Sequence, residues 1–572
     1  MVPPTLRDIF SVNIYQPNHR TTERTIRIRQ GPHKRTSHRT SIIRSQQQQQ
    51  QQQATSKKQD QRSIYEKVSL HRPLLAIASH RLALPTLDPA VQHPTSAMPP
   101  PQRILIVGGG PAGAVAAYHL AKSGLSVLIL ERSPSPTTST TRGQGIDITG
   151  PAISVIKRMG LYDTVRAACT GEKGFSMLDD AGTGIARLPA ADQTEGGKGG
   201  LQLTQELEIM RGDMTRILAS AAQSLSSAQS SAGGGNGKGG VEYRYGSTLT
   251  SLSQSSSSVT ATLSGPDGEE TTESFTAVIG ADGMNSTVRR LAFSPEVTEN
   301  CYRPIGQQWT AFFSIPAEEG DGEDSVLQQG VGCRTVLIRP IRTASSSSSS
   351  SASSSSPSSE KEQKLCSCYL VKTSHDPELA ESATKPRQQE QQKEIFARLF
   401  ASFPGSLRSR LLSGLRTTSD FYVAQTAQIH LPTWSSGRVA LVGDAAYAPS
   451  PVTGQGTAIA IVGAYILAGE LAKTPEDVEG AFERYESVFR PYVEKAQKIP
   501  GGARIPRLVN PETRWGIEVL RWVFWVIATT GVWRLFGGGW GGKKEEGWKL
   551  PEYDFAAVNH TGEGAGFNMM DA

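Results

Sequence analysis

The stretch from Arg103 to Glu131 limits most strongly what this chain can fold into. Its sequence, RILIVGGGPAGAVAAYHLAKSGLSVLILE, joins an apolar run, a glycine turn, an alanine-rich segment with helical periodicity and a second apolar run. This order predicts a strand, a tight turn, a helix and a second strand. Such a unit begins a Rossmann-like parallel sheet, so the predicted fold class is α/β.

The glycines of this turn stand at G-x-G-x-x-G spacing. Gly108 permits the turn, Gly110 lets backbone approach a pyrophosphate, and Gly113 allows the helix to pack closely on the strand. Phosphates would sit at the helix N-terminus, where unpaired N–H groups face them. Glu131 ends the second strand and can accept hydrogen bonds from ribose hydroxyls. These features predict a dinucleotide site, and they do not separate FAD from NAD.

The charge of the chain is unevenly distributed. The whole chain has a net charge of +6. Residues 1–97 carry +10, so residues 98–572 carry 6 − 10 = −4. This balance argues against a nucleic-acid surface on the part that looks folded. Five cysteines without a C-x-x-C pair or zinc-spaced histidines indicate a reduced compartment and no metal site. We therefore expect a cytoplasmic protein, with mitochondrial or peripheral membrane locations left open.

Residues 1–97 do not look like part of a fold. They contain a glutamine run from Gln46 to Gln53 and six of the ten histidines, with no sustained apolar period. Such a segment buries too little apolar surface to offset its ordering entropy, which predicts a disordered tail. An Arg-rich transit peptide is the alternative. We favour a start at Met98, a few residues before the first predicted strand.

A second motif follows the apolar run from Ala277 to Gly280. Asp282 and Gly283 come directly after this run, and an S-x-V-R segment that ends at Arg289 opens a helix. An acid and a glycine at the carboxyl end of a buried strand place a carboxylate and backbone N–H groups near a ligand. An ordinary strand-turn-helix connection would also have this appearance.

A third motif, RVALVGDAAYAPSPVTGQGTAIAIVGAYILAGEL, runs from Arg438 to Leu471. A buried strand ends on Gly443 and Asp444, and after a proline-bearing loop Gly454 to Gly456 open a long apolar helix. Asp444 can accept a hydrogen bond from a ribityl or ribose hydroxyl. The helix start presents N–H groups to a flavin ring or a phosphate.

In this order and at this spacing, the three motifs resemble those of the class A flavoprotein monooxygenases, the para-hydroxybenzoate hydroxylase-like group. The fungal and tetracycline-inactivating members look most similar, over about residues 103–555. The family often has His where this chain has Tyr447. The resemblance implies that an arginine at a helix start, Arg211, contacts FAD. The residues predicted to bind the cofactor are Gly108, Gly110, Ala112, Gly113, Glu131, Arg132, Gln144, Gly145, Arg211, Asp282, Gly283, Gly443, Asp444, Pro451, Gly454, Gln455 and Gly456.

The resemblance also implies a reaction. NADPH would bind transiently and reduce FAD, and the reduced flavin would capture O₂ as a C4a-hydroperoxide that hydroxylates an electron-rich aromatic or enolic molecule such as a polyketide. Because the cofactor supplies the chemistry, catalytic side chains are not expected to form a dyad and none is assigned. A dehydrogenase or reductase without oxygen insertion and a non-catalytic FAD-binding protein remain alternatives. The W-x-W-x-I-P signature of flavin-dependent halogenases is absent.

The predicted architecture is a Rossmann-like FAD-binding domain interleaved with a substrate domain on an antiparallel or mixed sheet, plus C-terminal helices. A hairpin at Phe175–Leu188 and strands between Ile305 and Val371 would cover the flavin. We expect Trp309, Phe312 and Phe313 to be core residues rather than pocket residues. The predicted parts are a tail, 1–97; FAD-binding segments, 103–170, 205–300 and 426–500; a substrate hairpin, 171–204; a substrate domain, 301–425; and a C-terminal helical segment with its tail, 501–572. Disordered insertions are predicted at 224–240, 345–364 and 385–393.

The segment from Trp515 to Phe536 is strongly apolar. Its longest uncharged run, Trp522 to Trp533, has twelve residues, which is too short for a bilayer span of about twenty. We therefore expect a helix packed on the substrate domain rather than one at a membrane surface. The oligomeric state is not predicted.

Overall fold

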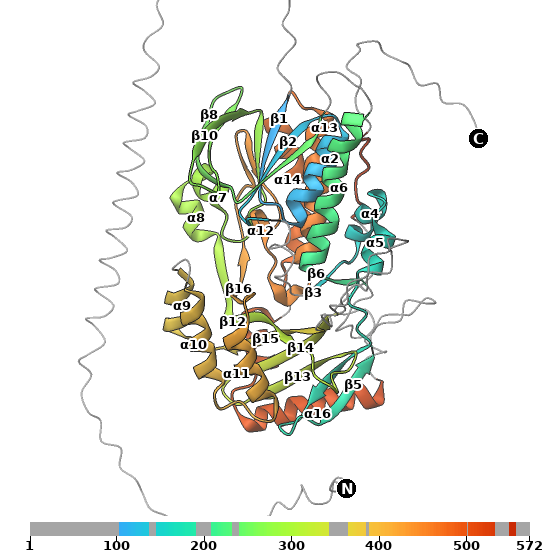
Figure 1. The fold of residues 1–572 in the computed structure, drawn as a ribbon, viewed down its shortest axis with the longest axis vertical. Coiled ribbons are helices and arrows are strands. Elements are labelled where there is room, and N and C mark those ends of the chain that lie inside the picture. The colour runs from blue at the N-terminus through green and yellow to red at the C-terminus, as the bar shows by residue number, and fades with distance from the viewer. Residues whose placement is uncertain are drawn as a thin grey trace, which may run out of the picture. The chain divides into compact units, whose positions relative to one another are not determined.

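Two sheets organise the protein in this computed structural model (Figure 1). The structure describes residues 102–135, 145–189, 207–231, 239–341, 364–384, 388–499, 501–531 and 548–555. The predicted tail, the serine run and Gln144 lie outside these residues. The described elements alternate between a parallel sheet with helices and a largely antiparallel sheet, which confirms the predicted α/β class with interleaved halves.

The first sheet has six strands in the order β17-β18-β11-β1-β2-β7, and all neighbours pair in parallel except β17 with β18. Ile104 of β1 pairs with Ala277 on one side and Val127 on the other, so the first and second motifs are direct neighbours. The strands are β1 (Arg103–Val107), β2 (Ser126–Glu131), β7 (Val241–Tyr245), β11 (Ala277–Gly280), β17 (Ser435–Ser436) and β18 (Val439–Leu441).

Helices of the first half pack against this sheet and one another. Helix α2 (Pro111–Lys122) contacts α6 (Arg211–Ser231) and α13 (Gly456–Lys473), and α13 also contacts α4 (Pro151–Arg158) and α14 (Val478–Ala496). Among the described residues, only α13 is long and apolar enough to cross a membrane, and 78% of that window is buried in the protein. Its burial is that of a core helix. The shorter helices are α5 (Tyr162–Ala167), α7 (Thr287–Ala292), α8 (Pro295–Asn300), α12 (Asp444–Tyr447) and α15 (Ile505–Val509).

The second sheet has seven strands in the order β16-β12-β15-β14-β13-β4-β5. Its pairs are antiparallel except β13 with β4, and it contains every strand predicted for the substrate half. The strands are β4 (Gly174–Leu178), β5 (Gly184–Pro189), β12 (Tyr302–Pro316), β13 (Asp324–Gly330), β14 (Arg334–Ile341), β15 (Leu365–Thr373) and β16 (Tyr422–Ile429). The domain boundary predicted between residues 425 and 426 falls inside β16.

The two faces of β12 have different roles. Trp309 and Phe313 are buried in an apolar cluster with α10 (Gln389–Phe400) and α11 (Leu407–Thr417), so both are core residues, as predicted. Phe312 alternates to the opposite face, because side chains of a strand alternate in direction. There it pairs across the strands with Tyr369 and Tyr422. A third helix, α9 (Pro377–Thr384), lies beside α10.

Two boundaries expected from the sequence are wrong. The amphipathic pattern of Glu208–Leu218 predicts a helix that begins near Glu208, but Glu208–Met210 form strand β6, which pairs with β3 (Gly145–Asp147). Helix α6 then continues to Ser231, into the predicted insertion, because the Ser226 hydroxyl bonds both the N–H and the carbonyl of Val241 at 2.7 and 2.9 Å. The polar composition of the stretch that ends at Ser231 therefore does not terminate the helix.

The insertion predicted at 385–393 is also partly wrong, since α10 begins at Gln389. The side-chain amide of Gln389 donates to the carbonyl of Phe421 at 3.1 Å, and the Lys393 ammonium donates to the carbonyl of Thr418 at 2.8 Å. Contacts with a distant segment thus hold the polar first turn in place.

Helix α16 (Arg514–Thr530) lies along the second sheet, against β5 and β13 (Figure 1). Phe524 packs with Met177 and Leu188, and Arg521 forms an ion pair with Asp180 at 2.6 Å. The helix packs on the substrate half as expected. Residues 532–536 of the predicted apolar segment lie outside the described residues. A three-stranded sheet of β8 (Thr248–Gln254), β9 (Val259–Ser264) and β10 (Glu270–Phe275) completes the described strands.

Candidate FAD and substrate site

The glycine turn between β1 and α2 has the shape that a pyrophosphate needs. A Cβ on Gly108, whose φ is +108°, would lie 2.4 Å from the carbonyl oxygen of Ala281. A Cβ on Gly113 would lie 2.0 Å from the carbonyl oxygen of Gly108. A Cβ on Gly110 would meet no protein atom within 4 Å, so open space lies at the N-terminus of α2. Two glycines are thus required by the fold, and the third faces room for a ligand.

Glu131 lies beside this turn at the end of β2. Its carboxylate accepts hydrogen bonds from the N–H of Gly109 at 2.9 Å and of Ser133 at 2.8 Å. The acid therefore holds the glycine turn, and its half-buried position is also that of the predicted ribose contact. Ala112 is buried in the first turn of α2, while Arg132 is exposed.

Asp282, after β11, has a structural role of its own. One carboxylate oxygen accepts from the Ser286 hydroxyl at 2.5 Å, and the other accepts from the N–H groups of Thr287 and Val288 at 2.6 and 3.2 Å. These bonds cap α7, as acids at helix N-termini do. Gly283 adopts a φ of +79° in open space. Contact of this pair with the cofactor stays a prediction.

Arg289 connects the second motif to the third. Its guanidinium donates to the carbonyls of Ala445 and Met284, both at 2.6 Å, and the residue is 4% exposed. Burial lowers the pKa of Arg289. The sequence placed Arg289 in a motif without indicating this contact, which spans 156 positions.

The third motif leaves a carboxylate available. Gly443, with a φ of +65°, precedes α12, and Asp444 is its first residue. Within the described residues Asp444 makes no side-chain hydrogen bond. Burial raises the pKa of Asp444, and the positive charge of Arg211 opposes this shift. A carboxylate in this state suits a ligand hydroxyl.

The loop after α12 leads to the start of the long helix. Pro451 opens a short 3₁₀ turn, η1 (Pro451–Thr453), and Gly454 follows with a φ of +64°. Gln455 is the N-cap of α13, and Gly456 is its first residue. The third motif therefore presents helix N-terminal N–H groups shortly after Asp444 in the chain, as the predicted flavin contact requires.

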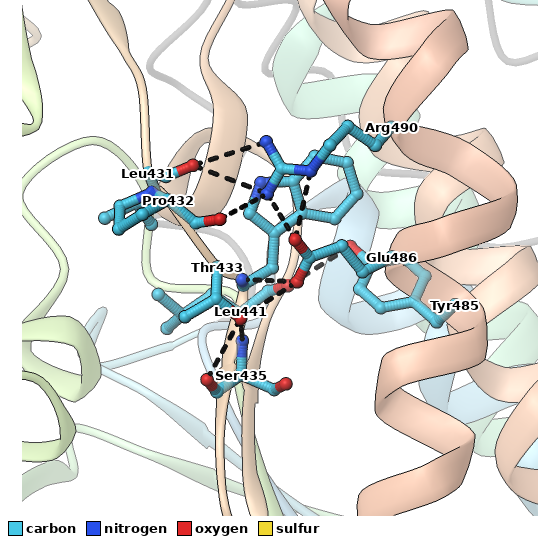
Figure 2. Close-up of polar contacts among 9 residues, drawn as sticks. Leu431, Pro432, Thr433, Ser435, Leu441, Tyr485, Glu486 and Arg490 are labelled. Atoms are coloured by element: carbon cyan, nitrogen blue, oxygen red, sulfur yellow. Dashed lines mark hydrogen bonds and ion pairs between the residues drawn. The ribbon is translucent and has the colours of Figure 1, made fainter.

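Helix α14 supports the strand that carries the third motif (Figure 2). The Glu486 carboxylate accepts from the Thr433 hydroxyl at 3.0 Å and from the N–H of Trp434 at 2.8 Å. Arg490 donates to the carbonyls of residues 431 and 432, and its guanidinium lies 4.7 Å from the centre of the Trp434 ring. The Tyr485 hydroxyl donates to the carbonyl of Leu441 at 3.1 Å. These bonds fix the strand that ends on Gly443 and Asp444.

The three motifs meet at one edge of the first sheet. They follow β1, β11 and β18, which are consecutive parallel neighbours. Carboxyl ends of parallel strands lie at the same edge, where ligands of open α/β sheets bind. The glycine turn, Asp282 and Asp444 therefore lie at one edge of the sheet, and their role as one extended FAD site stays a prediction.

A row of aromatic side chains on the second sheet contacts the FAD-binding half. Phe312 stacks on Tyr422 with ring centres 4.7 Å apart and meets the edge of Tyr369 at 5.2 Å. Burial raises the pKa of Tyr422, and the charge of Arg211 opposes the shift. The Tyr369 hydroxyl accepts a hydrogen bond from the N–H of Gly145 at 2.9 Å, and Gly145 belongs to β3 of the FAD-binding half.

Comparison with known proteins gives the family. Residues 102–304 and 377–498 match the family of FAD-binding domains. The chain is 41% identical to "Monooxygenase CTB7" of Cercospora beticola over 80% of this chain and 99% of that protein, and 30% identical to "FAD-dependent monooxygenase asL4" of Sarocladium schorii over 79% and 98%. The chain belongs to the class A flavoprotein monooxygenases. A solved tetracycline destructase, Tet(55), shares 27% identity, covering 80% of this chain and all of the other, with a TM-score of 0.57.

Membership in this monooxygenase family agrees with the geometry, and FAD is the cofactor it assigns to the site. The sequence nevertheless did not indicate a buried polar cluster made by Asp147, Glu172, Glu208, Arg339 and Tyr369. These residues come from five separate segments. Gly145 belongs to the same region, since its N–H donates to the Tyr369 hydroxyl at 2.9 Å.

Replacement of Asp444 should have opposite effects on the apo protein and on FAD binding. In Asp444→Asn, the raised pKa of the desolvated carboxyl no longer penalises folding, so we expect an unchanged or higher Tm of the apo protein. Loss of a charge-assisted hydrogen bond should weaken FAD binding by about 1–2 kcal/mol, roughly tenfold. Thermal unfolding and a flavin titration measure the two effects. Asp267→Asn, in an exposed turn, should change neither.

Proposed function

We propose that this monooxygenase uses NAD(P)H and O₂ to hydroxylate an aromatic or enolic small molecule. The observation that supports this most is the buried aromatic row of Phe312, Tyr369 and Tyr422, in which the Tyr369 hydroxyl accepts a hydrogen bond from the N–H of Gly145 in the predicted FAD site. Aromatic side chains beside a few placed polar groups are typical of sites for planar organic ligands.

Each part of the predicted site would have its own role in binding FAD or the substrate. The glycine turn of β1 and α2 would hold the FAD pyrophosphate, and Asp444 with the start of α13 would hold the ribityl chain and ring. FAD, when bound, supplies the redox chemistry with NAD(P)H and O₂. The second sheet would orient the substrate and keep water away, since Phe312 is 7% and Tyr369 8% exposed.

The relatives suggest a substrate class. Tet(55) is named a tetracycline destructase, and the two fungal relatives are named monooxygenases. On this likeness we infer a polyketide-like substrate with an aromatic or enolic ring. We also propose a cytoplasmic location, which is supported by the five free cysteines.

Turnover with and without oxygen tests the proposed reaction. We expect purified holoenzyme to oxidise NADPH faster when phenols or enolic polyketides are added, and to form product only when O₂ is present. Under anaerobic conditions NADPH should reduce the flavin and leave the organic substrate unchanged. Conversion of the substrate without O₂ would instead support a dehydrogenase or reductase.

A further inference from the structure

Three buried acidic side chains lie where the two halves meet. Asp147 of β3 pairs directly across from Glu208 of β6, and Glu172 comes from the connection between α5 and β4. The side chains of Glu172 and Glu208 are each 2% exposed. All three acids face Arg339 of β14, which belongs to the other sheet.

Arg339 cannot balance three carboxylates. It donates to both oxygens of Glu172 at 2.8 and 3.1 Å and forms an ion pair with Glu208. Apart from that ion pair, the described neighbour of the Glu208 carboxyl is the carboxyl of Glu172, with which it shares a hydrogen bond. Two carboxyls can share a hydrogen bond only when one of them is protonated, so a proton is held here. Burial raises the pKa of Glu208 to about 8, which makes this residue the neutral acid at pH 7.

Asp147 is the acid of this group that reaches the predicted ring end of the FAD site. One of its oxygens is buried without a hydrogen-bond partner in the described part of the chain. The other lies 3.7 Å from the position that a Cβ on Gly454 would occupy, just before α13. At least one acceptor oxygen of Asp147 is therefore left for a hydroxyl donor.

We propose that Asp147 is the proton-accepting residue of this site and binds the hydroxyl of an acidic phenol or enol, with Glu208 and Arg339 as its positioning residues. This inference rests on the proposed hydroxylation. In the step, the substrate O–H bond breaks, its electron pair stays on the substrate oxygen, and the proton bonds to Asp147. The resulting phenolate or enolate is more electron-rich at carbon and reacts more readily with an electrophilic oxygen.

The charged neighbours of Asp147 explain its titration. Burial raises the pKa of Asp147 to about 6; Arg339 opposes this shift, and Glu172 adds to it. Glu208 is neutral near pH 7, and the pKa of Tyr369 on β15 is raised to about 12, so this phenol stays protonated. Asp147 is therefore a carboxylate above about pH 6, which matches the acidity of enols and activated phenols better than that of simple phenols.

The first measurement is binding of phenol itself, which stays neutral from pH 5 to 8 because phenolic groups titrate near 10. Holoenzyme should bind phenol about tenfold more tightly as the pH rises through about 6, because an ionised acceptor strengthens the hydrogen bond. Perturbation of flavin absorbance reports binding. In Asp147→Asn the affinity should not change with pH, whereas Asp267→Asn should behave like the wild type. The same pH dependence in Asp147→Asn and wild type would overturn the proposal.

The second measurement is aerobic turnover. Asp147→Asn should keep its FAD and its reduction by NADPH but form product about 10²-fold more slowly or worse, without the loss of rate that the wild type shows below about pH 6. If this variant has the rate and the pH profile of the wild type, the role proposed for Asp147 is wrong, while the proposed hydroxylation is unaffected. If wild type forms no product, the proposed function fails and phenol binding still decides Asp147. If Asp147→Asn loses FAD, the same measurement is made with Asp147→Glu. A shift in the pH below which product formation slows supports the proposal, and an unchanged pH dependence contradicts it.

Discussion

Gly110→Val should give a folded protein that holds no FAD. A Cβ at this position meets no protein atom within 4 Å, and the backbone angles, φ −68° and ψ −177°, are those of extended chain that valine adopts. The valine side chain would fill the space predicted for the pyrophosphate. We expect a loss of FAD affinity of at least about 3 kcal/mol, more than roughly a hundredfold. Flavin absorbance of the purified protein and a titration with FAD measure it.

Two other glycine variants serve as controls for this result. Gly184→Val, at the start of β5 and likewise without atoms within 4 Å, should keep both fold and FAD. Gly113→Ala should fail to fold, because its Cβ would lie 2.0 Å from the carbonyl oxygen of Gly108. Wild-type FAD affinity in Gly110→Val would show that the pyrophosphate does not bind at this turn.

Arg289→Met should destabilise the protein and loosen its FAD site together. The substitution leaves the buried carbonyls of Ala445 and Met284 without their donor. Each unpaired buried carbonyl costs about 1–3 kcal/mol, so we expect the free energy of unfolding to fall by about 2–4 kcal/mol. Because Ala445 follows Asp444, FAD should dissociate faster as well. Thermal unfolding and flavin release measure the two effects.

The neighbouring arginine provides the control. Arg290 is exposed and donates to Asn285 and Thr287 within its own turn, at 2.7 and 2.8 Å. Exposed contacts of this kind contribute little, so Arg290→Met should stay within about 0.5 kcal/mol of wild type. Equal stability of the two variants would mean that Arg289 does not join the second and third motifs.

The sequence predicted the parallel sheet because local signals agreed with the fold. Apolar β-branched runs end on glycine or acid at Gly108, Glu131 and Gly443, and strand and turn preferences point the same way. The order of the motifs then placed them at one edge of the sheet. This part of the predicted FAD site follows from short stretches of chain.

What the sequence did not predict depends on contacts between distant segments. Helix α6 continues through serines because Ser226 bonds to Val241, which no periodicity indicates. The carboxyl cluster around Arg339 joins four segments, none of which carries a sequence signal for the cluster by itself. The sequence predicted Asp282 as a ligand-binding acid and did not indicate its cap on α7, because capping and ligand binding use the same residue type at the same place.

The central claim is that this monooxygenase transfers an oxygen atom from O₂ to an organic substrate. Turnover under ¹⁸O₂ with NADPH, followed by mass spectrometry of the product, tests it most directly. We predict one ¹⁸O atom in each hydroxylated product and none when the label is supplied as H₂¹⁸O. Product without label from ¹⁸O₂ would contradict the account.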